Sequence, residues 1–269
     1  MNIDLPFLPA RTVKTRETGV TMMMDKGLSI REAEDFIESS GEFTDLVKIA
    51  FGTGVFAKNI ETKIRLYREA NICVHFGGTL FEAFVVRDRF NDFRHFIDKY
   101  DMNAVEVSDG SMNIAHDKKL EYIRALSGQA TVLSEVGSKI QGVVITPDTW
   151  VSCMKSELEA GAWKVIAEAR ESGTIGIYKA DGSADKELIA LLDKEIGRDN
   201  ILWEAPNKNQ QVWFIKQFGA NVNLGNVATG EVVALESLRL GLRGDTFFQF
   251  LPDELCSFQF VQNAIETST

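Results

Sequence analysis

The stretch that decides the fold is residues 131–168, TVLSEVGSKIQGVVITPDTWVSCMKSELEAGAWKVIAE. Its two ends, residues 131–135 and 164–168, are short runs that are apolar on both alternations of a strand, which is typical of parallel strands covered on both faces. Between them, residues 149–160 carry apolar side chains at the spacing of an amphipathic helix. The stretch therefore predicts one strand–helix–strand unit of a parallel sheet.

The same alternation continues outward from this unit along the whole chain. Eight strands alternating with eight helices in 269 residues predict an α/β fold, a single (β/α)₈ TIM barrel. An open doubly wound sheet competes, but its Gly-x-Gly-x-x-Gly turn is absent after the first strand. The predicted strands are residues 20–24, 46–51, 72–76, 104–107, 131–135, 164–168, 201–204 and 221–224. The predicted helices are residues 29–38, 60–70, 90–100, 118–125, 149–160, 184–196, 209–218 and 230–240.

Nothing in the chain indicates a second domain, since it has no internal repeat, low-complexity tract or Pro/Ser-rich linker. We expect one domain over residues 1–269, with residues 1–18 leading into the barrel and residues 244–269 extending from it.

The charge balance restricts the partners. The 29 Lys and Arg against 39 Asp and Glu leave a formal charge of −10, which argues against nucleic acid or an anionic membrane as the main partner. Three dispersed cysteines, no basic-then-apolar leader and no long apolar run favour a cytoplasmic protein without a membrane span. We expect small anionic substrates, bound in a local basic pocket of a homo-oligomer.

Charged side chains stand near the ends of the predicted strands, where a TIM barrel carries its active site. Four glutamates on consecutive strands would repel one another unless cations balance them. Those cations are a divalent ion or the side chains of Lys48, Lys139 and Arg170; oxygen ligands favour Mg²⁺ over zinc. We predict Glu106, Glu135 and Glu168 as metal ligands, with Glu204 in reserve.

Further residues near the strand ends suit an anionic substrate. The turn that contains Asn223, Gly225 and Asn226 is a candidate phosphate site, because TIM barrels often bind phosphate after strands seven and eight. Arg239 and Arg243 either add charge to it or form a solvated helix end. Arg170 shares a strand face with Glu168, and we expect its guanidinium to bind an anion of the substrate.

Six segments in register along the chain resemble the phosphosulfolactate synthase family. The match runs from about residue 8 to residue 247, nearly the whole sequence. The segments are Met24-Asp-Lys-Gly-Leu28, Gly77-Gly-Thr-Leu-Phe-Glu82, Glu168-Ala-Arg-Glu-Ser-Gly173, Trp203-Glu-Ala-Pro206, Asn221-Val-Asn-Leu-Gly-Asn226 and Gly241-Leu-Arg-Gly-Asp245.

The resemblance implies a TIM-barrel lyase that adds sulfite to phosphoenolpyruvate with Mg²⁺ and gives (2R)-phospho-3-sulfolactate, the first step of coenzyme M biosynthesis in methanogens. It also implies that Mg²⁺ stabilises charge on the substrate carboxylate while a lysine protonates C2. We predict Lys139 as that acid. Lys26 and Lys48 are the alternatives for this role, and if they do not serve as the acid we expect them to bind phosphate or sulfite. Two other hypotheses remain open: another Mg²⁺-dependent lyase of a phosphorylated or carboxylated molecule, and a non-catalytic heat-stress-associated protein.

Overall fold

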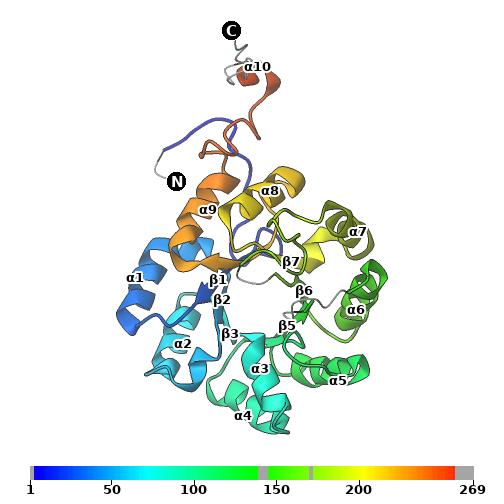
Figure 1. The fold of residues 1–269 in the computed structure, drawn as a ribbon. Helices are drawn as coiled ribbons and strands as arrows, with labels where there is room; N and C mark the ends of the chain where they lie inside the picture. The colour runs from blue at the N-terminus through cyan, green and yellow to red at the C-terminus, as the bar shows by residue number, and fades with distance from the viewer. Residues whose placement is uncertain (1–2, 139–144, 170–171, 258–269) are drawn as a thin grey trace, which may run out of the picture.

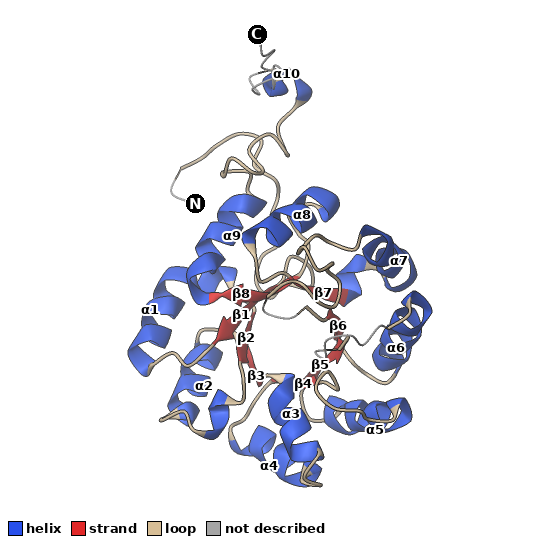
Figure 2. Cartoon of the chain, viewed as in Figure 1, coloured by secondary structure: helices blue, strands red, loops and turns tan. Residues whose placement is uncertain are grey.

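Eight parallel strands form a ring that helices surround (Figures 1 and 2). The structure, a computed structural model, describes residues 3–138, 145–169 and 172–257. The strands are β1 (Thr21–Asp25), β2 (Leu46–Ile49), β3 (Cys73–Phe76), β4 (Ala104–Val107), β5 (Thr131–Val136), β6 (Lys164–Ala167), β7 (Ile201–Glu204) and β8 (Leu224–Ala228). The predicted TIM barrel is confirmed, because buried apolar runs of this kind pair in parallel and need helices over their outer face.

The helices occupy nearly the predicted positions, and most of their boundaries shift by one or two residues. None of the helices that the structure describes has the length and apolar character needed to cross a membrane. The α-helices are α1 (Ile30–Ser40), α2 (Ile60–Glu69), α3 (Gly78–Val85), α4 (Phe90–Lys99), α5 (His116–Ser127), α6 (Pro147–Glu159), α7 (Lys186–Ile196), α8 (Lys208–Phe218), α9 (Val232–Arg239) and α10 (Asp253–Cys256).

Helix α3 is an element that the sequence patterns did not predict. It follows β3 directly and precedes α4, so this connection of the barrel contains two helices. Its sequence GTLFEAFV is apolar on most sides, and Leu80 and Phe81 are buried. A helix that is apolar nearly all round has no amphipathic period, which is why periodicity does not reveal it.

The eighth strand lies further along the chain than predicted. The expected strand at residues 221–224 is wrong, because β8 spans Leu224–Ala228. Asn223 precedes the strand, accepts a hydrogen bond from Val20 N at 3.1 Å and donates one to Ile201 O at 3.1 Å. The two asparagines at 221 and 223 imitate strand alternation, but they serve backbone groups at the amino-terminal end of the barrel.

The seam between β3 and β4 is the place where the barrel lacks a backbone ladder within the described residues. Ladder hydrogen bonds join the strands in the order β3-β2-β1-β8-β7-β6-β5-β4. The two end strands of this order still lie side by side (Figure 2). Side chains of the β4 region bridge them: Val74 N donates to Asn103 Oδ1 at 3.0 Å, and Gly78 N donates to Glu106 Oε1 at 2.6 Å.

The amino-terminal end of the barrel is closed by buried polar contacts. The fully buried guanidinium of Arg239, at the end of α9, donates to Ala220 O at 2.6 Å, Val222 O at 2.7 Å and Val20 O at 3.4 Å. Further out, an apolar groove is lined by residues 5–8 and 240–242 and by Phe247, Phe250, Leu251 and Leu255. Arg239 therefore ties the end of α9 to the segments that lead into β1 and β8.

We predict that Arg239→Met destabilises the fold without impairing the opposite end of the barrel. The substitution leaves three buried carbonyl oxygens without this donor, which costs about 3 kcal/mol of the free energy of unfolding, measured by urea denaturation. The control Arg198→Met removes an exposed guanidinium bonded to Asp193 and should cost less than about 1 kcal/mol. Equal losses in the two variants would contradict the assignment.

Candidate active site

A pocket of about 440 Å³ opens at the carboxyl-terminal ends of the strands. This is the end of a TIM barrel where the loops that follow the strands converge. Five charged side chains line it in the described part of the chain, and all five are buried. They are Lys48, Glu106, Glu135, Glu168 and Glu204.

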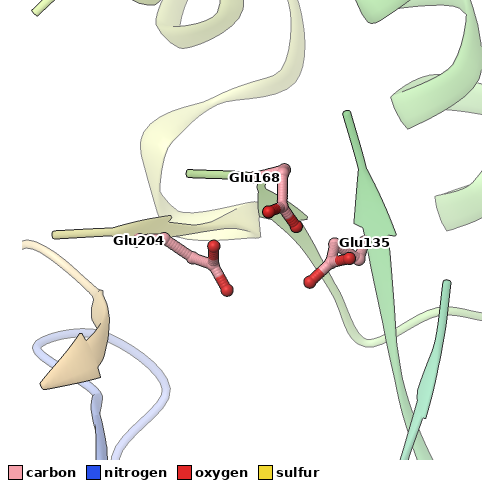
Figure 3. A group of neighbouring side chains, drawn as sticks. All are labelled: Glu135, Glu168 and Glu204. Carbon is pink, nitrogen blue, oxygen red and sulfur yellow. The ribbon is translucent and has the colours of Figure 1, made fainter. Parts of the chain in front are cut away.

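Three of the glutamates point their carboxylates toward one another (Figure 3). Each of Glu135, Glu168 and Glu204 offers an oxygen that lies within 4.8 Å of the oxygens offered by the other two. The three side chains come from β5, β7 and the residue directly after β6. Three buried carboxylates this close repel one another strongly in a medium of low dielectric constant, so the arrangement favours a bound cation.

Lys48 on β2 places its ammonium group against the acidic cluster. Its Nζ lies 3.0 Å from Glu204 Oε1, 3.1 Å from Glu106 Oε2 and 3.8 Å from Glu135 Oε2. Its neighbour on β3, His75, is fully buried, and burial lowers the pKa of this imidazole, which therefore adds no charge at neutral pH. Lys48 lines the pocket as predicted, and among the described residues of the lining this one ammonium faces four carboxylates.

The pKa of Glu204 shows the cost of burying a carboxylate in this cluster. Burial raises the pKa of Glu204 to about 7, with repulsion from Glu135 adding to the rise and attraction to Lys48 opposing it. Its Oε2 accepts a hydrogen bond from Ala169 N at 2.8 Å. The side chain is thus held in place even though its charged form is penalised.

The acidic cluster differs from the predicted metal set in one member. Glu135 and Glu168 belong to the cluster, but Glu204, the reserve, completes it instead of Glu106. Glu106 comes from β4, beside the seam, and its Oε1 accepts a hydrogen bond from Gly78 N of α3 at 2.6 Å. Its Oε2 shares the Lys48 ammonium with Glu135 and Glu204.

The predicted phosphate turn is corrected by the position of β8. Asn226 lies within the strand and lines the pocket, whereas Asn223 lies at the other end of the barrel. A side chain at Gly225 would come within 2.8 Å of Met22 Cε in the barrel interior, and this residue does not line the pocket. Arg243 follows α9, whose end lies at the amino-terminal face with Arg239, so neither arginine reaches the pocket.

Lys26 lies in the loop after β1, at the mouth of the barrel. Its exposed Nζ lies over the Phe51 ring, 5.8 Å from the centroid, beside a second hollow lined by Thr229 and Gly230. Asp25 holds this loop, because its buried Oδ1 accepts hydrogen bonds from Gly27 N and Leu28 N, each at 2.8 Å. The predicted acid Lys139 and the predicted anion ligand Arg170 lie outside the described residues.

The residues of the cluster fit a magnesium ion. Mg²⁺ prefers hard oxygen ligands at about 2.1 Å, so neighbouring ligand oxygens lie roughly 3 Å apart and opposite ones roughly 4.2 Å apart. The carboxylates of Glu135, Glu168 and Glu204 supply oxygens only, within 4.8 Å of one another. The donor atoms of the cluster and their close approach therefore suit this ion.

Two buried polar residues beside the pocket were not predicted as site residues. Glu82 on α3 and Ser108 after β4 are joined by a hydrogen bond of 2.6 Å, and Ser108 Oγ also lies 2.7 Å from Glu135 Oε1. The one signal available in the sequence is a glutamate within the apolar segment 80–85, where an unpaired charge is costly.

Comparisons with known proteins point to one family. The family model for (2R)-phospho-3-sulfolactate synthase (ComA) matches residues 9–245. The phosphosulfolactate synthase of Bacillus subtilis (strain 168) is 39% identical over 244 residues, 90% of this chain and 97% of that protein. That of Methanocaldococcus jannaschii is 39% identical over 237 residues, 86% of this chain and 94% of that protein.

A solved structure supports the fold alone. The 3-hexulose-6-phosphate synthase from Salmonella typhimurium superposes with a TM-score of 0.55 at 14% identity, over 83% of this chain and 100% of that one. The family model and the two synthases together cover nearly all of the barrel. The chain therefore belongs to the phosphosulfolactate synthase family of enzymes, as its sequence motifs predicted.

Proposed function

We propose that this protein joins sulfite to phosphoenolpyruvate in the pocket at the carboxyl-terminal end of the barrel. The observation that carries the proposal is the cluster of Glu135, Glu168 and Glu204 beside the Lys48 ammonium, in a chain that belongs to this family. The product is (2R)-phospho-3-sulfolactate. The acidic cluster holds Mg²⁺, which when bound supplies positive charge against the charge that develops on the substrate carboxylate.

The reaction is an addition that needs no oxidant or reductant. A bond forms between the sulfite sulfur and C3 of phosphoenolpyruvate, the C2–C3 double bond becomes single, and C2 takes a proton. In this proposal Lys139 delivers that proton. Lys48 stays close to the developing charge, since its ammonium is held at 3.0 Å from Glu204 and 3.1 Å from Glu106.

The phosphate of the substrate has a place at the mouth of the barrel. Lys26 is exposed there, and the hollow beside it is lined by Thr229 and Gly230, which follow β8 and precede α9. Backbone N–H groups at the start of a helix and a nearby ammonium group attract a phosphate. The proposed phosphate site is therefore this turn, in place of the one predicted at 223–226.

A direct assay tests the reaction. We expect purified protein, phosphoenolpyruvate labelled with ¹³C at C3, sulfite and Mg²⁺ to give a new sp³ carbon bonded to sulfonate sulfur, seen by ¹³C NMR. Samples without sulfite, or with EDTA, should show no such signal. If folded protein at high concentration forms no sulfonate over a long incubation, the proposed reaction is wrong; stabilisation by an unrelated phospho-acid would then favour another lyase.

We predict that Glu135→Gln weakens Mg²⁺ binding but does not destabilise the metal-free protein. Isothermal titration calorimetry should show an affinity at least about tenfold lower, because one of the charged ligands is lost. The melting temperature without Mg²⁺ should stay equal or rise, because the substitution removes repulsion among buried carboxylates.

The control for this substitution is Glu121→Gln, at an exposed glutamate paired with Lys118. It should alter neither the Mg²⁺ affinity nor the melting temperature. A Glu135→Gln protein that melts several degrees lower and binds Mg²⁺ normally would show that Glu135 has a structural role.

We predict that Lys26→Met raises the KM for phosphoenolpyruvate. The loss of one charge-assisted contact to the phosphate should raise KM by about tenfold. The melting temperature should stay the same, because the side chain is exposed. Lys58→Met, at an exposed lysine that does not line the pocket, is the matched control. An unchanged KM in steady-state kinetics would remove Lys26 from the phosphate site.

A further inference from the structure

Helix α3 carries a buried glutamate toward the acidic cluster. Glu82 is 4% exposed and stands among apolar residues, in a helix that also buries Leu80 and Phe81. Burying a carboxylate is costly unless it has partners that use it. The mechanism proposed above gives Glu82 no role, so its contacts decide what it does.

Those contacts lead to the proposed metal site. Glu82 Oε1 lies 2.6 Å from Ser108 Oγ and 3.3 Å from Ser111 N, and Ser108 Oγ lies 2.7 Å from Glu135 Oε1. The register of β4 and β5 places Ser108 level with Glu135, since Val107 pairs with Ser134. The hydroxyl of Ser108 therefore links Glu82 of α3 to the carboxylate of Glu135 on β5.

The approach of α3 to β4 depends on a glycine. A Cβ at Gly78 would lie 2.3 Å from Ser108 Cβ and 2.8 Å from Glu106 Oε1. Gly78 N instead donates to Glu106 Oε1 at 2.6 Å, one turn of helix before Glu82. The start of α3 is thus held against β4 at two points, both next to the pocket.

We propose that Glu82 is a positioning residue that acts through Ser108 to fix the carboxylate of Glu135 for magnesium binding. This inference rests on the proposed function only in taking Mg²⁺ as the ion. Glu82 itself touches neither substrate nor metal. Residues that orient a metal ligand commonly alter metal affinity by about 10- to 100-fold when they are removed.

The number of donor hydrogens in these contacts determines which substitutions at position 82 are informative. The hydroxyl of Ser108 has one hydrogen and lies close to two carboxyl oxygens, so one hydrogen cannot serve both. Glutamine at position 82 keeps the shape and brings N–H donors, which leaves the Ser108 hydrogen for Glu135. Leucine keeps the approximate volume and removes the contact.

The experiment measures Mg²⁺ binding by isothermal titration calorimetry for the full chain and its variants. Glu82→Leu and Ser108→Ala should each weaken binding by about tenfold or more, and the double variant should be no weaker than either single one. Glu82→Gln should stay within about threefold of the unsubstituted protein. Glu61→Leu, at an exposed glutamate of α2, is the matched control.

Several outcomes would overturn the inference. Normal Mg²⁺ affinity in a folded Glu82→Leu protein would do so, as would losses that add up in the double variant. If Glu82→Leu does not fold, the inference is tested by Ser108→Ala and Glu82→Gln. Normal Mg²⁺ affinity in Ser108→Ala would then reject the inference.

The failure of this inference is distinguishable from that of the proposed reaction. Weakened Mg²⁺ binding in Glu82→Leu without any sulfonate formation by the unsubstituted protein would leave the inference standing and reject the reaction. Sulfonate formation by a protein that binds no Mg²⁺ would reject the inference and the role of Mg²⁺, and would keep the addition of sulfite to phosphoenolpyruvate. A protein that does neither would reject both.

Discussion

Repulsion among buried carboxylates is the constraint on which the carboxyl-terminal end of this barrel depends. Glu135, Glu168 and Glu204 converge within 4.8 Å, and their charged forms are costly in a buried pocket. The surrounding groups reduce that cost: Lys48 supplies charge, and Ala169 N supplies a hydrogen bond to Glu204. The arrangement persists because strands and helices fix the backbone beneath each carboxylate, so the side chains have little freedom to move apart.

The opposite end of the barrel provides that rigidity. There the buried polar groups are donors and acceptors of ordinary hydrogen bonds, as with Arg239 and the carbonyls of Ala220 and Val222. Asn223 likewise bridges β1 and β7 through Val20 N and Ile201 O. The amino-terminal end of the barrel thus holds satisfied hydrogen bonds, and the carboxyl-terminal end holds crowded carboxylates. This division between a stabilising end and a functional end is expected of enzymes with this fold.

The order of the elements could be predicted from the sequence, but the depth of individual side chains could not. Apolar runs with helical stretches between them locate most strands within one or two residues. They do not report which carboxylates converge in space, so they could not distinguish Glu204, which belongs to the acidic cluster, from Glu106, which does not. The polar alternation at Asn221 and Asn223 led to a predicted strand that ends where β8 begins. The apolar sequence of α3 has no helical period, so neither the helix nor the role of Glu82 was predicted. These errors share one cause, since burial and register depend on neighbours that are distant in sequence.

The seam between β3 and β4 has a mechanical consequence. A ring of strands joined everywhere by backbone hydrogen bonds can widen only if some of those bonds break. In the described residues of this barrel, side chains at Asn103 and Glu106 make the connection at the seam in place of backbone ladder bonds. The circumference can therefore adjust at this one position while the other strand pairs stay intact. Glu106 both lines the pocket and accepts the hydrogen bond from Gly78 N across the seam, so the pocket wall and the closure of the barrel depend on one carboxylate.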